Sequence, residues 1–150
     1  MRNNIWEQVE RVIRSNNDRG IANAFWALGS LGSLSSEHPK VVREALFQGF
    51  TRAAYYSSSW GLCNMVWGFA KMGYVWRDFP SCLKVAVGEN IWRIGSEMNA
   101  IDVSVMTWSL GSLMVPLDSS FAPIQSAEMQ GVEARILRPL SSAIIRTIYI

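Results

Sequence analysis

Three tryptophans spaced 41 residues apart constrain the fold of this chain more than any other feature. Trp26, Trp67 and Trp108 each lie in a twelve-residue segment that aligns with the other two without gaps. After each tryptophan, small and large apolar residues alternate in the same order. The three segments read IANAFWALGSLG, LCNMVWGFAKMG and VSVMTWSLGSLM. Self-similarity at a fixed period of about 20–50 residues is typical of repeat architectures.

The residues between the tryptophan segments keep the same period. Apolar residues recur there at i, i+4 and i+8, which is a helical spacing. A proline precedes each run, and proline suits the first turn of a helix because its missing N–H costs nothing there. The matching positions are Pro39 and Pro80, Val42 and Leu83, Leu46 and Val87, and Phe50 and Ile91.

These patterns predict an all-α protein, an α-solenoid of paired antiparallel helices with a 41-residue repeat. Each repeat holds a tryptophan helix, a turn and a second helix. We expect residues 1–150 to form a single helical-repeat domain. Its parts are a leading half repeat at 1–16, repeats at about 18–56, 59–97 and 100–138, and a partial fourth repeat at 140–150.

The two ends of this array are expected to expose unfinished repeats. Residues 3–14 fit a helix with Ile5, Val9, Val12 and Ile13 facing inward, but no tryptophan helix precedes them. Free solenoids need polar terminal repeats. We therefore expect other protein chains to cover the open ends of the solenoid.

The composition points to a chain with little charged surface. It is 49% hydrophobic and 17% charged, whereas average soluble domains carry roughly 25% charged residues. This indicates either surplus apolar surface that a partner covers or a compact core with a sparse polar coat. The net charge is +2 and the charges are interspersed, so no basic arm of the kind that binds nucleic acid is present.

Residues that usually carry chemistry are few and scattered. Cys63 and Cys82 lie 19 residues apart without metal-ligand spacing, and the single histidine, His38, reads as a cap or loop residue before Pro39. Phosphate-binding glycine motifs are absent. We expect no enzyme activity, no metal and no cofactor. The longest uncharged apolar run, residues 103–117, is shorter than the about 20 residues of a membrane span.

The tryptophan helices are apolar nearly all round, except for a narrow polar stripe. At about 100° per residue, Asn64, Gly68 and Lys71 fall on one side of the second helix, and Trp67 borders them. The small residues at this position, Ala27, Gly68 and Ser109, either belong to an open surface or permit close helix packing. The tryptophans Trp26, Trp67 and Trp108 are expected to form the structural core of the repeats, with base stacking as the alternative.

A family resemblance adds to this interpretation. The string Asn64 to Tyr74, NMVWGFAKMGY, resembles the N-x-x-W-A-L-A-K-L-G-Y signature of octatricopeptide repeats, which FAST-kinase-domain and heptatricopeptide-type proteins share. Residues 23–32, NAFWALGSLG, match it almost as well. The third copy departs from the signature at Val105 and Met114.

The resemblance implies an RNA-binding helical-repeat protein of the mitochondrion or another organelle. Such a protein acts as a component of a ribonucleoprotein, for example a mitochondrial ribosome subunit that contacts rRNA, or it binds an organellar transcript. No clear cleavable targeting peptide is visible, because Glu7 and Glu10 interrupt the N-terminal arginines. The alternative is an armadillo- or HEAT-like protein–protein scaffold without RNA contact.

If RNA binds, we expect it along the polar stripe of the tryptophan helices. Its contacts should be mainly to phosphate and sugar, because amides, hydroxyls and few cations cannot specify many bases. The predicted RNA-binding residues are Asn23, Ser30, Asn64, Lys71 and Ser112, helped by Arg19 and Arg77.

Overall fold

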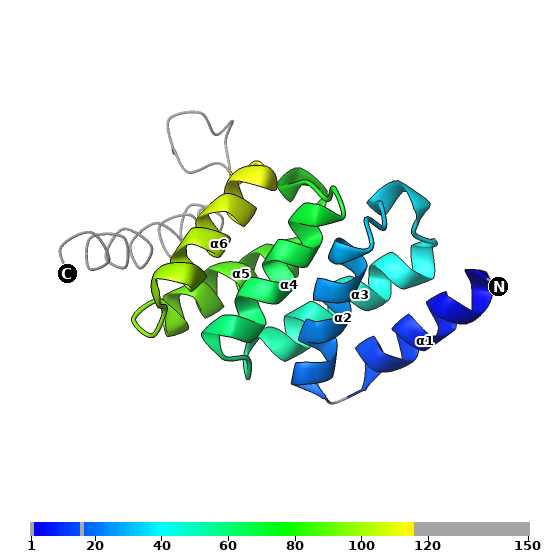
Figure 1. Ribbon diagram of the computed structural model, residues 1–150, viewed down its shortest axis with the longest axis horizontal. Coiled ribbons are helices and arrows are strands. Elements are labelled where there is room, and N and C mark those ends of the chain that lie inside the picture. Colours follow the sequence, from blue (N-terminus) through cyan, green and yellow to red (C-terminus); the bar gives the residue numbers. More distant parts are fainter. Residues whose placement is uncertain (1, 16, 116–150) are drawn as a thin grey trace.

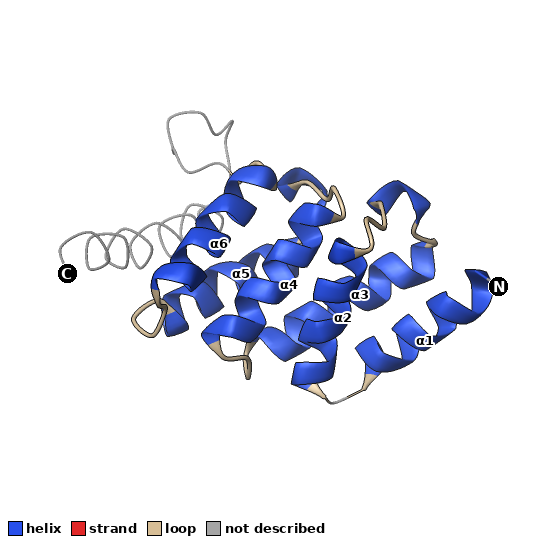
Figure 2. Cartoon of the chain, in the orientation of Figure 1, coloured by secondary structure: helices blue, strands red, loops and turns tan. Residues whose placement is uncertain are grey.

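The computed structural model describes residues 2–15 and 17–115, and it is helical throughout (Figures 1 and 2). These residues form six α-helices and two short 3-10 helices, and they contain no strand. The predicted all-α class is therefore confirmed. The second half of the predicted third repeat and the predicted partial fourth repeat lie outside the described residues.

The elements follow one another with short connections. Their bounds are α1 Arg2–Arg14, α2 Asp18–Ser30, η1 Ser35–Glu37, α3 Lys40–Ala54, α4 Ser59–Lys71, η2 Trp76–Asp78, α5 Ser81–Ile94 and α6 Ala100–Ser112. Pro39 and Pro80 stand immediately before α3 and α5 as N-cap residues, one position earlier than the first helical turn. Among the described residues, no helix is long and apolar enough to cross a membrane.

The helices form two layers. In Figure 1, α2, α4 and α6 lie side by side in one layer, which we call the A layer, while α3 and α5 lie behind them. Helix α1 packs against α3 and α2 at the end of the row. We call α1, α3 and α5 the B layer. Successive helices along the chain therefore alternate between the two layers.

The three A-layer helices begin in the same way. Each is preceded by a polar N-cap residue, at positions 17, 58 and 99, whose side chain accepts a hydrogen bond from a backbone N–H of the first turn. Asn99 also forms a capping box with Asp102. Such caps satisfy backbone donors that have no partner within the helix, which fixes each helix start within one residue.

The same helices also end alike. Gly32 and Gly73 follow α2 and α4 with φ of 69° and 74°, which is the left-handed conformation that glycine adopts without steric cost. The third helix ends on Met114, a non-glycine residue with φ of 58°. The sequence signature therefore loses its closing glycine at α6 while the backbone keeps the same turn.

A phenylalanine cluster fills the space between the two layers. Phe69 of α4 packs against Phe25 of α2, with ring centroids 4.7 Å apart, and against Phe50 of α3 at 5.6 Å. Both Phe25 and Phe69 are fully buried. Phe79, which follows η2, closes the cluster at 4.9 Å from Phe69. The aromatic core of the described repeats is thus made of phenylalanines.

The predicted structural role of the tryptophans in the repeat core does not match their burial. Trp26 is 52% exposed and Trp108 is 49% exposed, and Trp67 is half-buried. The residue before each of the first two tryptophans, Phe25 or Val66, is buried instead. A shift of one residue turns a side chain by about 100° around a helix, which is enough to move it from the core to the surface.

Candidate functional site

The A-layer helices approach each other closely through small residues. A Cβ atom placed on Gly68 of α4 would lie 2.5 Å from the backbone oxygen of Phe25 in α2. A Cβ on Gly29 would lie 3.1 Å from the Trp67 ring and 3.2 Å from the Cα of Gly68. The two helices therefore meet backbone to backbone, and glycine is required at position 68.

This packing decides between the two interpretations of the small residues. Gly68 is buried in the α2–α4 contact, and Ser109, its counterpart on α6, is 0% exposed. The Ser109 hydroxyl donates a hydrogen bond to the Val105 carbonyl within its own helix. These two positions permit close helix packing and do not belong to an open polar surface.

The tryptophans line the outer side of the A layer. On each A-layer helix, the tryptophan shares a face with the residues three before and four after it. We call this surface the tryptophan face, and its nine members come from α2, α4 and α6. They are Asn23, Trp26 and Ser30, then Asn64, Trp67 and Lys71, then Val105, Trp108 and Ser112.

Lys71 joins two of these tryptophans. Its ammonium nitrogen lies 5.9 Å from the ring centroid of Trp67 and 6.0 Å from that of Trp108. A cation about 6 Å from a ring centroid is attracted by the π-face of the ring. The Lys71 side chain is exposed, so its charge is placed between two aromatic rings at the surface.

The structure brings together five of the seven predicted RNA-binding residues. Four of them, Asn23, Ser30, Lys71 and Ser112, are exposed, and Asn64 is half-buried; all five belong to the tryptophan face. Arg19 and Arg77 are exposed as well, but they stand apart from one another. Arg19 is in the first turn of α2, whereas Arg77 is in η2 beyond the end of α4, 3.6 Å from Asp78.

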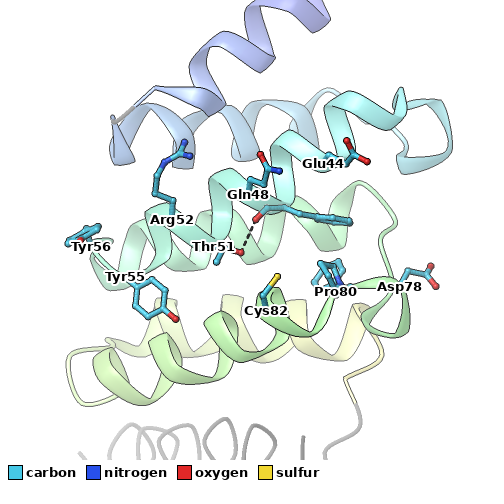
Figure 3. A pocket seen from close by; sticks show the side chains of 11 residues that line it. Glu44, Gln48, Thr51, Arg52, Tyr55, Tyr56, Asp78, Pro80 and Cys82 are labelled. Atoms are coloured by element: carbon cyan, nitrogen blue, oxygen red, sulfur yellow. Dashed lines mark hydrogen bonds between the residues drawn. The ribbon is translucent and has the colours of Figure 1, made fainter. Parts of the chain in front are cut away.

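The B layer is hollowed by a groove of about 850 Å³ between α3 and α5 (Figure 3). Figure 3 shows Tyr55 and Tyr56 at one end of this groove and Glu44 and Asp78 at the other. The Tyr55 hydroxyl bridges the two helices by donating a hydrogen bond of 2.9 Å to Glu89, and that bond raises the pKa of the phenol. We call this hollow the B groove. Its lining residues are Glu44, Phe47, Gln48, Thr51, Arg52, Tyr55, Tyr56, Asp78, Phe79, Pro80 and Cys82.

Two arginines of the B layer have a structural role that the sequence interpretation missed. The Arg52 guanidinium donates hydrogen bonds to the carbonyls of Ile13 and Ser15 at the end of α1. Arg93, which lies 41 residues later, donates in the same way to Ala54 and Ser57 at the end of α3. A cation at a helix C-terminus is favourable. Their 41-residue spacing was the signal that could have identified them.

His38 is a buried structural residue. It is 4% exposed, its Nε2 is hydrogen-bonded to the Ser33 hydroxyl, and its Nδ1 is hydrogen-bonded to the Tyr74 hydroxyl, each at 2.9 Å. Burial lowers the pKa of His38, with a small opposing effect from Glu37. The edge of Trp6 packs on the histidine ring at 5.2 Å. This network ties the turn after α2 to the turn after α4.

The cysteines offer no reactive site on these coordinates. Cys63 is buried, and burial together with the charge of Asp102 raises the pKa of its thiol to about 12. The thiol therefore stays protonated at neutral pH, and the thiolate is the nucleophilic form. Within residues 2–15 and 17–115, no three histidine, cysteine or acidic side chains gather into a potential metal site.

Comparisons with known proteins give no match: none was found to a protein family, to a curated protein or to a solved structure. The resemblance to octatricopeptide repeats therefore rests on the signature residues themselves. Its two best copies coincide with α2 and α4 and with the glycine turns that follow them.

Proposed function

We propose that this chain is an α-solenoid of 41-residue helix pairs that acts as a non-catalytic, RNA-binding structural component of an organellar ribonucleoprotein, such as the mitochondrial ribosome. In this role the tryptophan face contacts RNA, and other parts of the surface contact neighbouring proteins. The observation that carries the proposal is the row of partly exposed tryptophans at equivalent positions of three adjacent helices, with Lys71 between two of them.

The composition of the tryptophan face suits single-stranded RNA. Aromatic rings stack on bases with little sequence preference, and each such contact contributes about 1–3 kcal/mol. Amide and hydroxyl groups from Asn23, Ser30 and Ser112 can bind phosphate, sugar and base edges. With a single lysine on this face, the electrostatic contribution stays small, so the salt dependence of binding should correspond to only two or three phosphates.

The combination Lys71→Glu with Asn64→Ala tests the proposal. Both changes alter the tryptophan face without removing a core side chain, and RNA crosslinking in the native assembly is the measurement. Lys40→Glu is the matched control, because Lys40 is an 83% exposed lysine at the start of α3 whose one ion pair, with Glu44, spans 3.7 Å. Lys84 is less suitable as a control because its ammonium lies over the ring of Trp76.

We expect the double variant to lose RNA crosslinking and the Lys40→Glu control to retain it. Equal loss in both would mean that only net charge matters. No crosslinking in the parent protein would contradict the proposal and favour a protein–protein scaffold. The B groove favours that second candidate, because its floor is aromatic and apolar, with Phe47, Phe79 and Pro80 among its lining residues.

A further inference from the structure

The end of the molecule formed by α1 and α2 exposes apolar positions whose counterparts elsewhere in the chain are buried. Ile5 is 59% exposed, whereas Leu46 and Val87, 41 and 82 residues later, are 0% and 1% exposed. Leu31 is 80% exposed, whereas Met72 and Leu113 are both 0% exposed. Helix propensity cannot explain these differences, because each set occupies the same place in the same kind of helix.

Three further positions at this end follow the same rule. Val9 and Val12 of α1 are half-buried, while the residues 41 and 82 positions later are fully buried. Ala27 of α2 is also half-buried, whereas Gly68 and Ser109 are buried. We call the surface formed by these positions the open end face. Its members are Ile5, Val9 and Val12 of α1 and Ala27 and Leu31 of α2.

A backbone acceptor at this face repeats the pattern. The carbonyls of Met72 and Leu113 each accept a hydrogen bond of 2.7 Å from the turn after the preceding A-layer helix, donated by Ser35 and Trp76. No described residue donates to the carbonyl of Leu31, which is their counterpart. The open end face thus lacks both the apolar contact and the hydrogen bond that its two counterparts receive.

The contact between α2 and α4 shows what fits against such a face. Helix α2 places the backbone of Phe25 against Gly68 and accepts Trp67 and Lys71 over Gly29. The helix that covers the face therefore carries a large apolar residue and, four positions later, a small one. Helix α4 repeats this pair as Val66 and Ala70 on the side that meets α6.

We infer that the open end face binds one helix of a partner protein, an amphipathic helix with a large apolar residue at i and glycine or alanine at i+4. The interface that joins α6, α4 and α2 continues onto this face, and the partner helix extends the A layer by one member. A turn after that helix donates a backbone N–H to the Leu31 carbonyl. The inference rests on the proposed role as a fixed component of an assembly and names the class of partner for that role.

An extended chain tests whether the face accepts such a helix. Residues 18–41 are added directly before Met1, so that the copy of α2 keeps the 41-residue register with α2 itself. We expect the thermal midpoint to rise by at least about 4 °C and hydrogen exchange in α1 and α2 to slow about tenfold. The control carries the same extension with Phe25→Asp and Gly29→Trp in the added copy, and it should show neither effect. Equal effects from both extensions, or no effect from either, would overturn the inference.

A crosslinking experiment identifies the natural occupant. A photoreactive amino acid replaces Leu31 in the native assembly, and the crosslinked peptide is sequenced. The inference requires a helical segment of another protein with the large-x-x-x-small pattern at the crosslinked site, and no such product when the same amino acid replaces Tyr56, which is 79% exposed in the B layer. A crosslink to RNA, to a second copy or to this same chain, or no crosslink, would overturn it. The extension experiment needs no RNA, so a failure of the RNA proposal leaves its outcome unchanged.

Discussion

The two layers of this protein are joined by different means. In the A layer, α2 and α4 meet backbone to backbone at Gly68, so that one added methyl group would collide with a carbonyl oxygen. In the B layer, arginines reach from one helix to the end of the preceding one, and the B groove of about 850 Å³ remains between α3 and α5. Closer packing on the A side than on the B side favours a row of helices that curves towards the tryptophan face.

This difference indicates where the chain tolerates change. The spacing of the tryptophans is set by contacts between backbone atoms, which cannot adjust. The spacing of the B-layer helices is set by long side chains, which can. We therefore expect substitutions in the A-layer contact to be costly and substitutions in the B-layer contact to be milder, and the following variants rank these effects.

The largest effect should come from the phenylalanine cluster beneath the A layer. Phe69→Ala removes a fully buried ring that contacts phenylalanines of both layers, and such truncations cost about 3–5 kcal/mol. Trp26→Ala, on the outer side of the same layer, should cost far less because Trp26 is half exposed. Chemical denaturation of both variants measures the contrast. A larger loss for Trp26→Ala would place the tryptophans back in the core.

The next effect concerns the backbone contact itself. Gly68→Ala places a methyl group 2.5 Å from the Phe25 carbonyl oxygen, and we expect a loss of about 1–3 kcal/mol. Gly111→Ala is the matched control, since no atom lies within 4 Å of its added Cβ; it should be neutral or stabilise by up to about 1 kcal/mol, because alanine favours a helix. A neutral Gly68→Ala variant would show that the A layer is looser than described.

The arginine contact in the B layer should matter less. Arg93→Met keeps most of the side-chain length but removes the hydrogen bonds to the Ala54 and Ser57 carbonyls. We expect a loss of about 1–2 kcal/mol in the free energy of unfolding. Arg77→Met, at a side chain that is 88% exposed, should change stability by less than about 0.5 kcal/mol. Identical values for the two variants would remove Arg93 from the account of the B layer.

The smallest effect is a pH dependence at His38. Burial lowers the pKa of this histidine below its ordinary value of 6.5, so the unfolded state binds the proton first as the pH falls. Stability should be unaffected by this group above pH 6.5. Below that value it should decrease by up to about 1.4 kcal/mol per pH unit until the folded-state pKa is reached. His38→Gln should flatten this part of the stability profile, and an unchanged profile would contradict the burial of a neutral ring.

Periodicity in the sequence was enough to place the helices. The spacing of the tryptophan segments anticipated α2, α4 and α6, and the prolines marked the starts of α3 and α5 to within one residue. Periodicity could not show which side of each helix its neighbours approach. A helical wheel treats Gly68 and Lys71 as members of one stripe, whereas the close approach of α2 buries Gly68 and leaves Lys71 exposed.

The tryptophans were misplaced for a related reason. Large aromatic residues at helical spacing are usually core residues, but here the smaller residues Phe25 and Val66 take that place and the indoles lie outside. The arginine contacts of Arg52 and Arg93 were missed because the repeat comparison considered apolar positions and not charged ones. Each of these outcomes depends on contacts between residues about 40 positions apart, which local pattern does not encode.

The position of RNA on the surface is the central claim, and crosslink mapping tests it most directly. After ultraviolet irradiation of the native assembly, mass spectrometry locates the amino acids that carry a nucleotide. The account predicts crosslinks at Trp26, Trp67 and Trp108 or at their neighbours on the tryptophan face, with none in the B groove. Crosslinks confined to α3 and α5, or none on this chain when RNA is crosslinked elsewhere in the same assembly, would contradict it.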